Sequence, residues 1–289
     1  MTQEELLALI DQAAEEGWKE LDLSGNSLTE LPAAIGKLTQ LETLILGKLE
    51  WQDNKVVPTL ITNQLVTLPD ELAMLENLRS LNLSGNPLKV IPEIVFRLQS
   101  LEVLRLVSVG LSEIPYSLIQ LTNLTTLFLN NNQITQIPEA IAQLTNLTTL
   151  SLCSNQITQI PEAIAQLTNL NSLDLQNNQI TQIPEAIAQL TNLTYLFLQN
   201  NQITQIPEKI TQLTNLIHLS LYNNQITQIP EVIGQLTNLT TLYLWSNQIT
   251  QIPEALIQLT NLTKLNLSRN QIAEIPEAIG QLTNLTTLY

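Results

Sequence analysis

Hydrophobic residues recur along this chain in a fixed frame of 23 positions. The copy that begins at Leu124 reads LTTLFLNNNQITQIPEAIAQLTN, and its octapeptide NQITQIPE recurs verbatim from Asn132 to Asn247. In the first six positions of this copy, LTTLFL, Leu127 and Leu129 alternate with Thr126 and Phe128. Because successive side chains of a strand point to opposite sides, this alternation predicts a short β-strand with one buried face.

The rest of the frame predicts a turn, a descending leg and a short helical turn. Asn132 ends the strand, where a buried side-chain amide satisfies backbone groups of the turn. Pro138 fits the first position of a helical turn, and Glu139 follows where the helix dipole favours a carboxylate. Ile141 and Leu144 are three positions apart, so they share one face of that turn and close the core.

This frame is the leucine-rich repeat pattern, and its repetition predicts a solenoid. A strand this short is not stable alone, so each pairs in parallel with its neighbour and the leucines stack into one core. The predicted fold class is α/β: a leucine-rich repeat solenoid, or horseshoe, with a parallel sheet on the concave face and short helical turns on the convex face. About twelve coils are expected, and the last is incomplete. Their first residues are Trp18, Leu41, Leu78, Leu101, Leu124, Leu147, Leu170, Leu193, Leu216, Leu239, Leu262 and Leu285.

The turn asparagine recurs in most coils and predicts a structural ladder. Side-chain ladders of Gln, Thr and Asn between coils are expected from the same repetition. The ladder asparagines are Asn26, Asn63, Asn86, Asn132, Asn155, Asn178, Asn201, Asn224, Asn247 and Asn270. The fourth coil has Val109 at this position, so its turn needs hydrogen bonds from water or from the backbone.

Residues 1–17 do not follow the frame, whereas residues 18–289 do. Thr2 and Glu5 predict a capping box, and Gly17 suits the end of a helix. The expected apolar face consists of Leu6, Leu7, Ile10 and Ala13. The segment is interpreted as an N-terminal capping helix over the open core of the first coil. A targeting helix is the alternative, and the acidity of the segment opposes it.

The second coil is longer than the others. Asn26 and Asn63 are 37 residues apart, so 14 residues beyond the frame lie near residues 47–62. Trp51 in this insertion either folds back on the coil or anchors a partner. At the other end, LTNLTTLY stops at Tyr289 inside a strand. This end predicts either a fragment of a longer protein or a homo-oligomer in which the uncapped C-terminal ends meet.

Composition narrows the classes of partner. The net charge is −15, with only 11 Lys and Arg, which argues against nucleic acid because phosphate binding needs clustered cations. No stretch of about 20 apolar residues spans a membrane. The single Cys153 excludes an internal disulfide. Asn-x-Ser/Thr sequons recur throughout, and glycosylation of tightly stacked turns is unfavourable. These features predict a cytoplasmic, bacterial protein.

The coils differ from one another mainly at the positions that the frame does not specify, which are the third, fifth, seventh and eighth of each coil. These positions line the concave face, where solenoids usually bind. Aromatic rings gather there in three consecutive coils: Tyr195, Phe197, His218, Tyr222, Tyr243 and Trp245. Phe128 extends the group toward the N-terminus, and Lys264 and Arg269 form a basic border. Rigid exposed rings predict a protein-binding surface. The alternative is that the rings only pack on one another and cover the sheet.

The sequence contains no catalytic constellation, and it predicts no enzyme activity, no metal and no cofactor. His218 and Cys153 are too few ligands for zinc. They lie three strands apart, too far for a nucleophile and its base. The glutamates that follow the repeat proline form an acidic stripe on the convex side, best explained by solubility and helix-start electrostatics. They are Glu139, Glu162, Glu185, Glu208, Glu231, Glu254 and Glu277.

The region from Glu4 to Gly47, the insertion and the repeats that follow resemble the N-terminal repeat region of bacterial Roco proteins. In that family the repeats precede a Ras-like GTPase domain and a dimerisation domain. The resemblance implies a regulatory segment that contacts such domains, and the chain itself has no GxxxxGK[ST] motif. Two functions are therefore expected: a non-enzymatic protein-interaction module, or the regulatory segment of a Roco-type GTPase. A purely structural spacer is a third.

Overall fold

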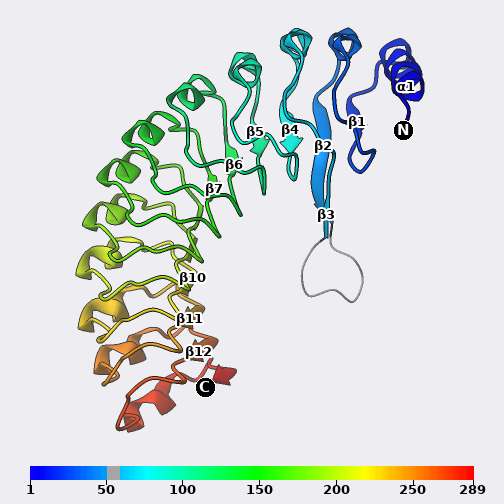
Figure 1. The fold of residues 1–289 in the computed structure, drawn as a ribbon. Helices are drawn as coiled ribbons and strands as arrows, with labels where there is room; N and C mark the ends of the chain where they lie inside the picture. Colours follow the sequence, from blue (N-terminus) through cyan, green and yellow to red (C-terminus); the bar gives the residue numbers. More distant parts are fainter. Residues whose placement is uncertain (51–58) are drawn as a thin grey trace. The chain divides into compact units, whose positions relative to one another are not determined.

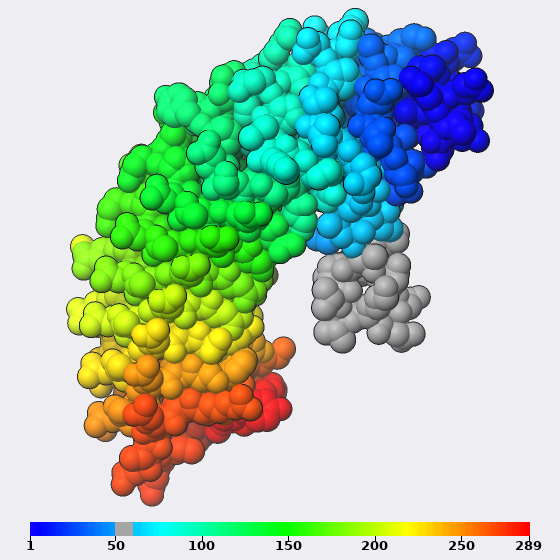
Figure 2. Space-filling view, viewed as in Figure 1, coloured from blue at the N-terminus to red at the C-terminus, as the bar shows by residue number. Residues whose placement is uncertain are grey.

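The computed structural model describes residues 1–50 and 59–289, which form two compact units, residues 1–134 and 135–289. Each unit repeats one coil: a short strand, a turn and a five-residue 3-10 helix (Figure 1). In the space-filling view, the atoms of each coil lie directly against those of the next within a unit (Figure 2). The predicted leucine-rich repeat solenoid is confirmed.

The first unit holds the capping helix α1 (Gln3–Glu16) and a sheet in which strand order follows chain order. Its parallel strands are β1 (Glu20–Asp22), β2 (Thr43–Glu50), β4 (Ser80–Leu83), β5 (Val103–Arg105) and β6 (Thr126–Phe128). Strand β3 (Thr59–Ile61) pairs with β2 in antiparallel fashion. The 3-10 helices are η1 (Ala33–Lys37), η2 (Asp70–Met74), η3 (Glu93–Arg97) and η4 (Tyr116–Gln120).

The second unit repeats the coil with little variation. Its parallel strands are β7 (Thr149–Ser151), β8 (Ser172–Asp174), β9 (Tyr195–Phe197), β10 (His218–Ser220), β11 (Thr241–Tyr243), β12 (Lys264–Asn266) and β13 (Thr287–Leu288). Its 3-10 helices are η5 (Glu139–Gln143), η6 (Glu162–Gln166), η7 (Glu185–Gln189), η8 (Glu208–Gln212), η9 (Glu231–Gln235), η10 (Glu254–Gln258) and η11 (Glu277–Gln281).

The 23-residue spacing sets the register of the sheet. Leu196 pairs with Leu219, and Leu219 pairs with Leu242, so identical frame positions lie side by side. The coil from Leu193 buries Leu196 on the strand, Leu198 directly after the strand and Ile210 on the 3-10 helix, all at 0% exposure. Parallel pairing and leucine stacking therefore build a continuous core within each unit.

The repeat proline lies one residue earlier than predicted. Pro138 is the cap that precedes η5, with extended backbone (φ −69°, ψ 148°), and Glu139 is the first helical residue. The Pro138 carbonyl accepts the first bond of the turn from the Ile141 N–H at 3.0 Å. The prediction that proline occupies the first helical position was wrong, because the ring also fits the extended cap and only its carbonyl is needed there.

Helix α1 begins and ends as the sequence predicts. The Thr2 hydroxyl accepts from the Glu5 N–H and the Glu5 carboxylate accepts from the Thr2 N–H, while Gly17 has a left-handed φ of 67°. Leu6, Ile10 and Ala13 are buried. Leu7 was wrongly assigned to the buried face: it is 36% exposed. Among the described residues, every helix is too short or too polar to cross a bilayer.

The insertion in the second coil forms an antiparallel hairpin at its base. Strand β2 continues past its parallel neighbours, and Lys48 pairs with Ile61 on β3. Gly85 (φ 73°) makes room for this pair, since a Cβ there would lie 2.1 Å from Thr62 Cγ2. Trp51, predicted to fold back or to anchor a partner, lies outside the described residues.

Candidate partner-binding surface

The ladder asparagines connect each strand to its turn and to the coil before it. Asn132 Nδ2 donates to the carbonyls of Leu106 (2.8 Å) and Leu129 (2.9 Å). Its Oδ1 accepts from the N–H groups of Val109 (3.1 Å), Gly110 (2.9 Å) and Leu111 (3.1 Å) in the preceding coil. Without these bonds, the buried N–H and carbonyl groups of the turn would lack hydrogen-bond partners, and the coil would be less stable. The same pattern holds the strands of the second unit in a fixed register.

Val109 shows how a coil manages without its ladder asparagine. In other coils the ladder asparagine accepts a hydrogen bond from the equivalent of the Leu88 N–H. Here the Leu88 N–H donates to the Asn86 carbonyl at 2.8 Å instead. The Val109 side chain is 1% exposed and replaces the amide with apolar packing. The N–H groups of the fourth coil's own turn donate to the Asn132 side chain of the next coil. The prediction that water or the backbone supplies the hydrogen bonds of this turn was therefore wrong, and the backbone bond satisfies a group of the coil before it.

The six rings of strands β9, β10 and β11 and the turns after them form one surface of the second unit, here called the ring patch. Its members are Tyr195, Phe197, His218, Tyr222, Tyr243 and Trp245. Tyr195 and His218 are register partners on adjacent strands. The strand side chains that alternate with them, such as Leu196 and Leu219, are fully buried. The ring patch therefore lies on the face of the sheet opposite the core, called the strand face below.

Four rings of the patch form a continuous row. Tyr195 stacks on Phe197 with centroids 6.4 Å apart, and Phe197 contacts His218 at 4.9 Å. His218 meets Tyr243 edge-on at 5.6 Å and 88°. Tyr195 remains 41% exposed. These contacts fix the orientation of the rings, so the rings lose little conformational entropy when a partner binds. The exposed part of the rings leaves apolar area for that partner to cover.

The other two rings form a stacked pair beyond the strand ends. The centroids of Tyr222 and Trp245 are 4.3 Å apart and their planes differ by 12°. Both side chains are partly exposed. The pair and the row together present aromatic surface on three consecutive coils.

His218 is the titratable member of the ring patch. Burial between its neighbours lowers the pKa of His218, and the positive charge of Lys264 lowers it further. The imidazole is therefore neutral at physiological pH and behaves as an aromatic surface.

The two predicted basic border residues occupy different positions in their coil. Lys264 is exposed on β12 and is the register partner of Thr241. Arg269 is exposed in the turn after β12, with a left-handed φ of 54°. In the second unit, where every residue is described, the ion pair formed is that of Lys209 with Glu185 (2.6 Å), so neither border residue is neutralised by a carboxylate.

Phe128 was predicted to extend the ring patch, and it belongs to the first unit. It ends β6, and the guanidinium carbon of Arg105 lies 5.3 Å from its ring centroid. Sequence reasoning missed Arg105, although a cation one coil before an aromatic at the same frame position was the available signal.

Polar groups occupy the strand face next to the ring patch. Ser151 Oγ donates to Asp174 Oδ2 at 3.0 Å. Burial raises the pKa of Asp174, and hydrogen bonds from Gln176 and Ser151 offset part of that shift. Burial, followed by the charge of Asp174, raises the pKa of Cys153 to about 12. A thiol of this kind is a poor nucleophile at neutral pH.

Cys153 and His218 do not form a catalytic pair. Cys153 follows β7, whereas His218 begins β10, and the rings of Phe197 and Tyr243 contact the imidazole. Among the described residues, no group of three or more His, Cys, Asp or Glu side chains is arranged to hold a metal ion.

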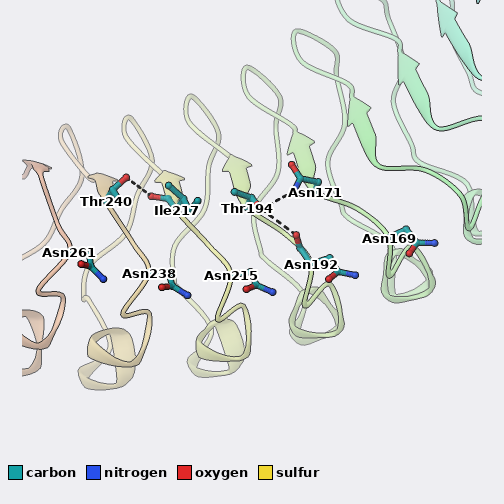
Figure 3. Close-up of a pocket in the computed structure, with 9 residues that line it drawn as sticks. All are labelled: Asn169, Asn171, Asn192, Thr194, Asn215, Ile217, Asn238, Thr240 and Asn261. Atoms are coloured by element: carbon teal, nitrogen blue, oxygen red, sulfur yellow. Dashed lines mark hydrogen bonds between the residues drawn. The ribbon is translucent and has the colours of Figure 1, made fainter.

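A shallow groove of about 710 Å³ runs along the edge of the second unit where the strands begin (Figure 3). Asparagines of successive coils line it, and they act as a second ladder: Asn192 Nδ2 donates to the Thr168 carbonyl at 2.9 Å and Asn238 Nδ2 to the Thr214 carbonyl at 2.7 Å. The groove contains none of the ring patch, and Ile217 is its one apolar lining residue. The sequon asparagines here serve coil stacking, and their amide nitrogens are the atoms that N-glycosylation would modify.

The acidic stripe lies on the 3-10 helices, away from the strand face. In the second unit, each repeat glutamate is the first residue of its 3-10 helix, as Glu139 is in η5 and Glu231 in η9. On β9 to β12 the strand residues include no carboxylate. Negative charge and aromatic surface are therefore separated within each coil.

Family models of leucine-rich repeats match most of the chain. A model described as a leucine-rich repeat region matches residues 67–155 and 209–289. Two further leucine-rich repeat models match residues 145–203 and 18–38. A search of curated protein sequences gave no match.

Solved structures with the same coil include bacterial and plant proteins. A leucine-rich repeat protein of Leptospira interrogans is 36% identical, with a TM-score of 0.78 over 96% of this chain and 80% of that one. An internalin of Listeria monocytogenes is 27% identical, with a TM-score of 0.69 over 99% of this chain and 93% of that one. The ectodomain of the Arabidopsis thaliana receptor kinase GASSHO1/SCHENGEN3, in complex with CASPARIAN STRIP INTEGRITY FACTOR 2, is 31% identical, with a TM-score of 0.74 over 95% of this chain and 36% of that one.

Proposed function

Because the chain belongs to the leucine-rich repeat family, we propose that it is a non-enzymatic module that binds another protein on the strand face of its second unit. The observation that carries this proposal is the ring patch: a row of four rings and a stacked pair of rings on three consecutive coils, with area left in solvent. Aromatic side chains on a rigid support are typical of interface hot spots. The bound factor in the GASSHO1/SCHENGEN3 complex supports recognition by this type of coil.

The test compares a double variant, Tyr243→Ala with Trp245→Ala, with the wild-type chain. Each is immobilised and used for affinity capture from the source cells, and binding of each retained protein is then measured by titration. Tyr116→Ala is the matched control, since Tyr116 is 68% exposed and begins η4, away from the strand face. We expect the control to bind like wild type and the double variant to bind at least tenfold more weakly.

Circular dichroism separates this proposal from a packing role of the rings. Both substituted side chains lie on the surface, so the double variant should keep the wild-type spectrum. Unchanged affinity for every retained protein would exclude the ring patch as the interface. Loss of the folded spectrum would instead favour the alternative that the rings stabilise the sheet.

A second candidate is the regulatory segment of a Roco-type GTPase. The features that favour it are the acidic capping helix α1 and the β2–β3 hairpin in an enlarged second coil, which carry the resemblance to that family. The matched family models describe the repeat itself, which Roco proteins share with other repeat proteins. The test is the full reading frame: a GxxxxGK[ST] motif after Tyr289 supports this candidate, and a capping coil followed by a stop codon contradicts it. The cytoplasmic location stays a prediction.

A further inference from the structure

Arg105 occupies the strand face of the first unit, where its neighbours are neutral. It is the last residue of β5 and the register partner of Asn82 on β4 and Phe128 on β6. Val103 and Val107 flank it on its own chain segment, and the Arg105 side chain is partly buried. Its guanidinium carbon lies 5.3 Å from the Phe128 ring centroid.

Arg105 differs from most other basic residues of the unit because no carboxylate accompanies it. Lys19 pairs with Glu42 at 3.0 Å, Lys48 pairs with Asp22 at 2.6 Å, and Arg79 pairs with Glu102. Within residues 1–50 and 59–289, the Arg105 guanidinium makes neither an ion pair nor a hydrogen bond. Burial lowers the pKa of Arg105.

A partly buried guanidinium without an acceptor is unfavourable. It has given up part of its water shell, and its five N–H donors have no partner among the residues that the structure describes. Contact with one aromatic ring recovers part of this loss, and it satisfies none of the donors. The donors therefore remain available to an acceptor from another molecule, and arginine is a preferred residue for such contacts.

We propose that Arg105 and Phe128 form a binding site for a carboxylate side chain of a partner polypeptide. The fork of the guanidinium accommodates the two carboxylate oxygens side by side, and the Phe128 ring supports its other face. A single carboxylate matches the site because one positive charge is present and its strand neighbours are neutral. A phosphate would leave excess negative charge on a chain that already carries −15.

The experiment measures NMR shifts in the full chain on addition of N-acetyl-glutamate amide, a blocked amino acid with one carboxylate. At constant ionic strength, we expect the Phe128 ring and Val103 methyl signals to shift saturably, with a dissociation constant on the order of 10 mM. Arg105→Gln should abolish the shifts. Arg97→Gln should retain them, because Arg97 is exposed on η3.

Two other probes decide the chemistry of the site. N-acetyl-glutamine amide has the same size without the charge and should give no saturable shift. Inorganic phosphate should bind more weakly than the carboxylate. Equal shifts with the glutamine probe, stronger binding of phosphate, or no shift with the carboxylate at about 100 mM would each overturn the proposal.

Thermal unfolding separates a binding role from a structural one. Arg105→Met keeps the length of the side chain and removes the unpaired charge, so the midpoint should equal or exceed that of the wild type. A lower midpoint would mean that the Arg105–Phe128 contact serves the fold, and it would overturn the proposal. None of these measurements depends on the ring patch of the second unit.

Discussion

Replacing Asn201 with valine measures how strongly the asparagine ladder stabilises the second unit. Asn201 is 8% exposed, and its Oδ1 accepts from the Ile180 N–H at 2.9 Å. Its Nδ2 donates to the carbonyls of Leu175 and Leu198, both at 3.0 Å. Each of these carbonyls also accepts from a neighbouring ladder asparagine at 3.0 Å. With the backbone in its wild-type geometry, which lacks the Leu88-type bond to a backbone carbonyl, the variant leaves one buried group, the Ile180 N–H, without an acceptor.

The magnitude follows from this inventory of hydrogen bonds. An orphaned buried N–H costs about 1–3 kcal/mol, and each carbonyl that keeps one donor loses about 0.5 kcal/mol. Valine fills the same position in the fourth coil as Val109, so no large cavity term is added. The expected loss in free energy of unfolding is about 2–4 kcal/mol.

The assay combines urea unfolding with hydrogen exchange at the Ile180 amide. Hydrogen exchange reports the local effect directly, because repeat proteins can unfold in parts. Asn200→Gly is the matched control: Asn200 has a left-handed φ of 56°, which glycine accepts, and its amide bonds to Asn177 and Asn223 on the surface. The control should lose less than about 1 kcal/mol. Equal losses in the two variants, or unchanged protection of Ile180, would refute the role assigned to the ladder.

Three further predictions concern Cys153, Asp174 and Gly17. Asp174→Asn removes a charge that helps raise the pKa of Cys153, so iodoacetamide should alkylate Cys153 faster at pH 8 in the variant, as measured by mass spectrometry. Burial raises the pKa of Asp174, so the folded chain binds this proton more tightly than the unfolded chain, and stability is lost as pH rises through the folded-state pKa. Asp174→Asn should therefore unfold at higher urea than wild type at pH 7, with a difference that shrinks as the pH falls toward about 4; a pH-independent difference would contradict this. Gly17→Ala forces a left-handed residue at φ 67° and should destabilise α1 by about 1 kcal/mol, seen as faster exchange of its amides.

The fold was predictable because, in a strict repeat, the position of a residue within its coil also determines which residues of the neighbouring coils it contacts. Once Leu196 and Leu219 occupy the same frame position, a 23-residue spacing makes them register partners. The position of Pro138 was not fixed in this way, because a proline ring suits both an extended cap and a first helical residue. The hairpin of β2 and β3 was also missed, because the insertion does not follow the 23-residue frame from which the other strands were predicted.

The ring patch could be found as a set of positions, but its internal contacts could not. Frame positions place His218 beside Tyr195, yet the closest ring contact of His218 is with Phe197, which depends on side-chain rotamers. Arg105 was overlooked for a similar reason. The sequence places Arg105 one coil before Phe128 at the same frame position, but it does not show that the guanidinium lacks a carboxylate partner among the described residues.

The asparagine ladder also bears on how such a chain changes length. From Asn178 to Asn270, each ladder asparagine bonds to its own coil and to the preceding one, as Asn224 does with the carbonyls of Leu221 and Leu198. Every junction between these coils thus has the same chemistry, so an in-frame duplication or deletion of 23 residues creates no new kind of contact. Recombination between identical NQITQIPE segments would move the ring patch along the solenoid by whole coils and leave its own neighbours intact. The repeat thereby permits evolution to shift the ring patch along the chain in steps of 23 residues without redesigning it.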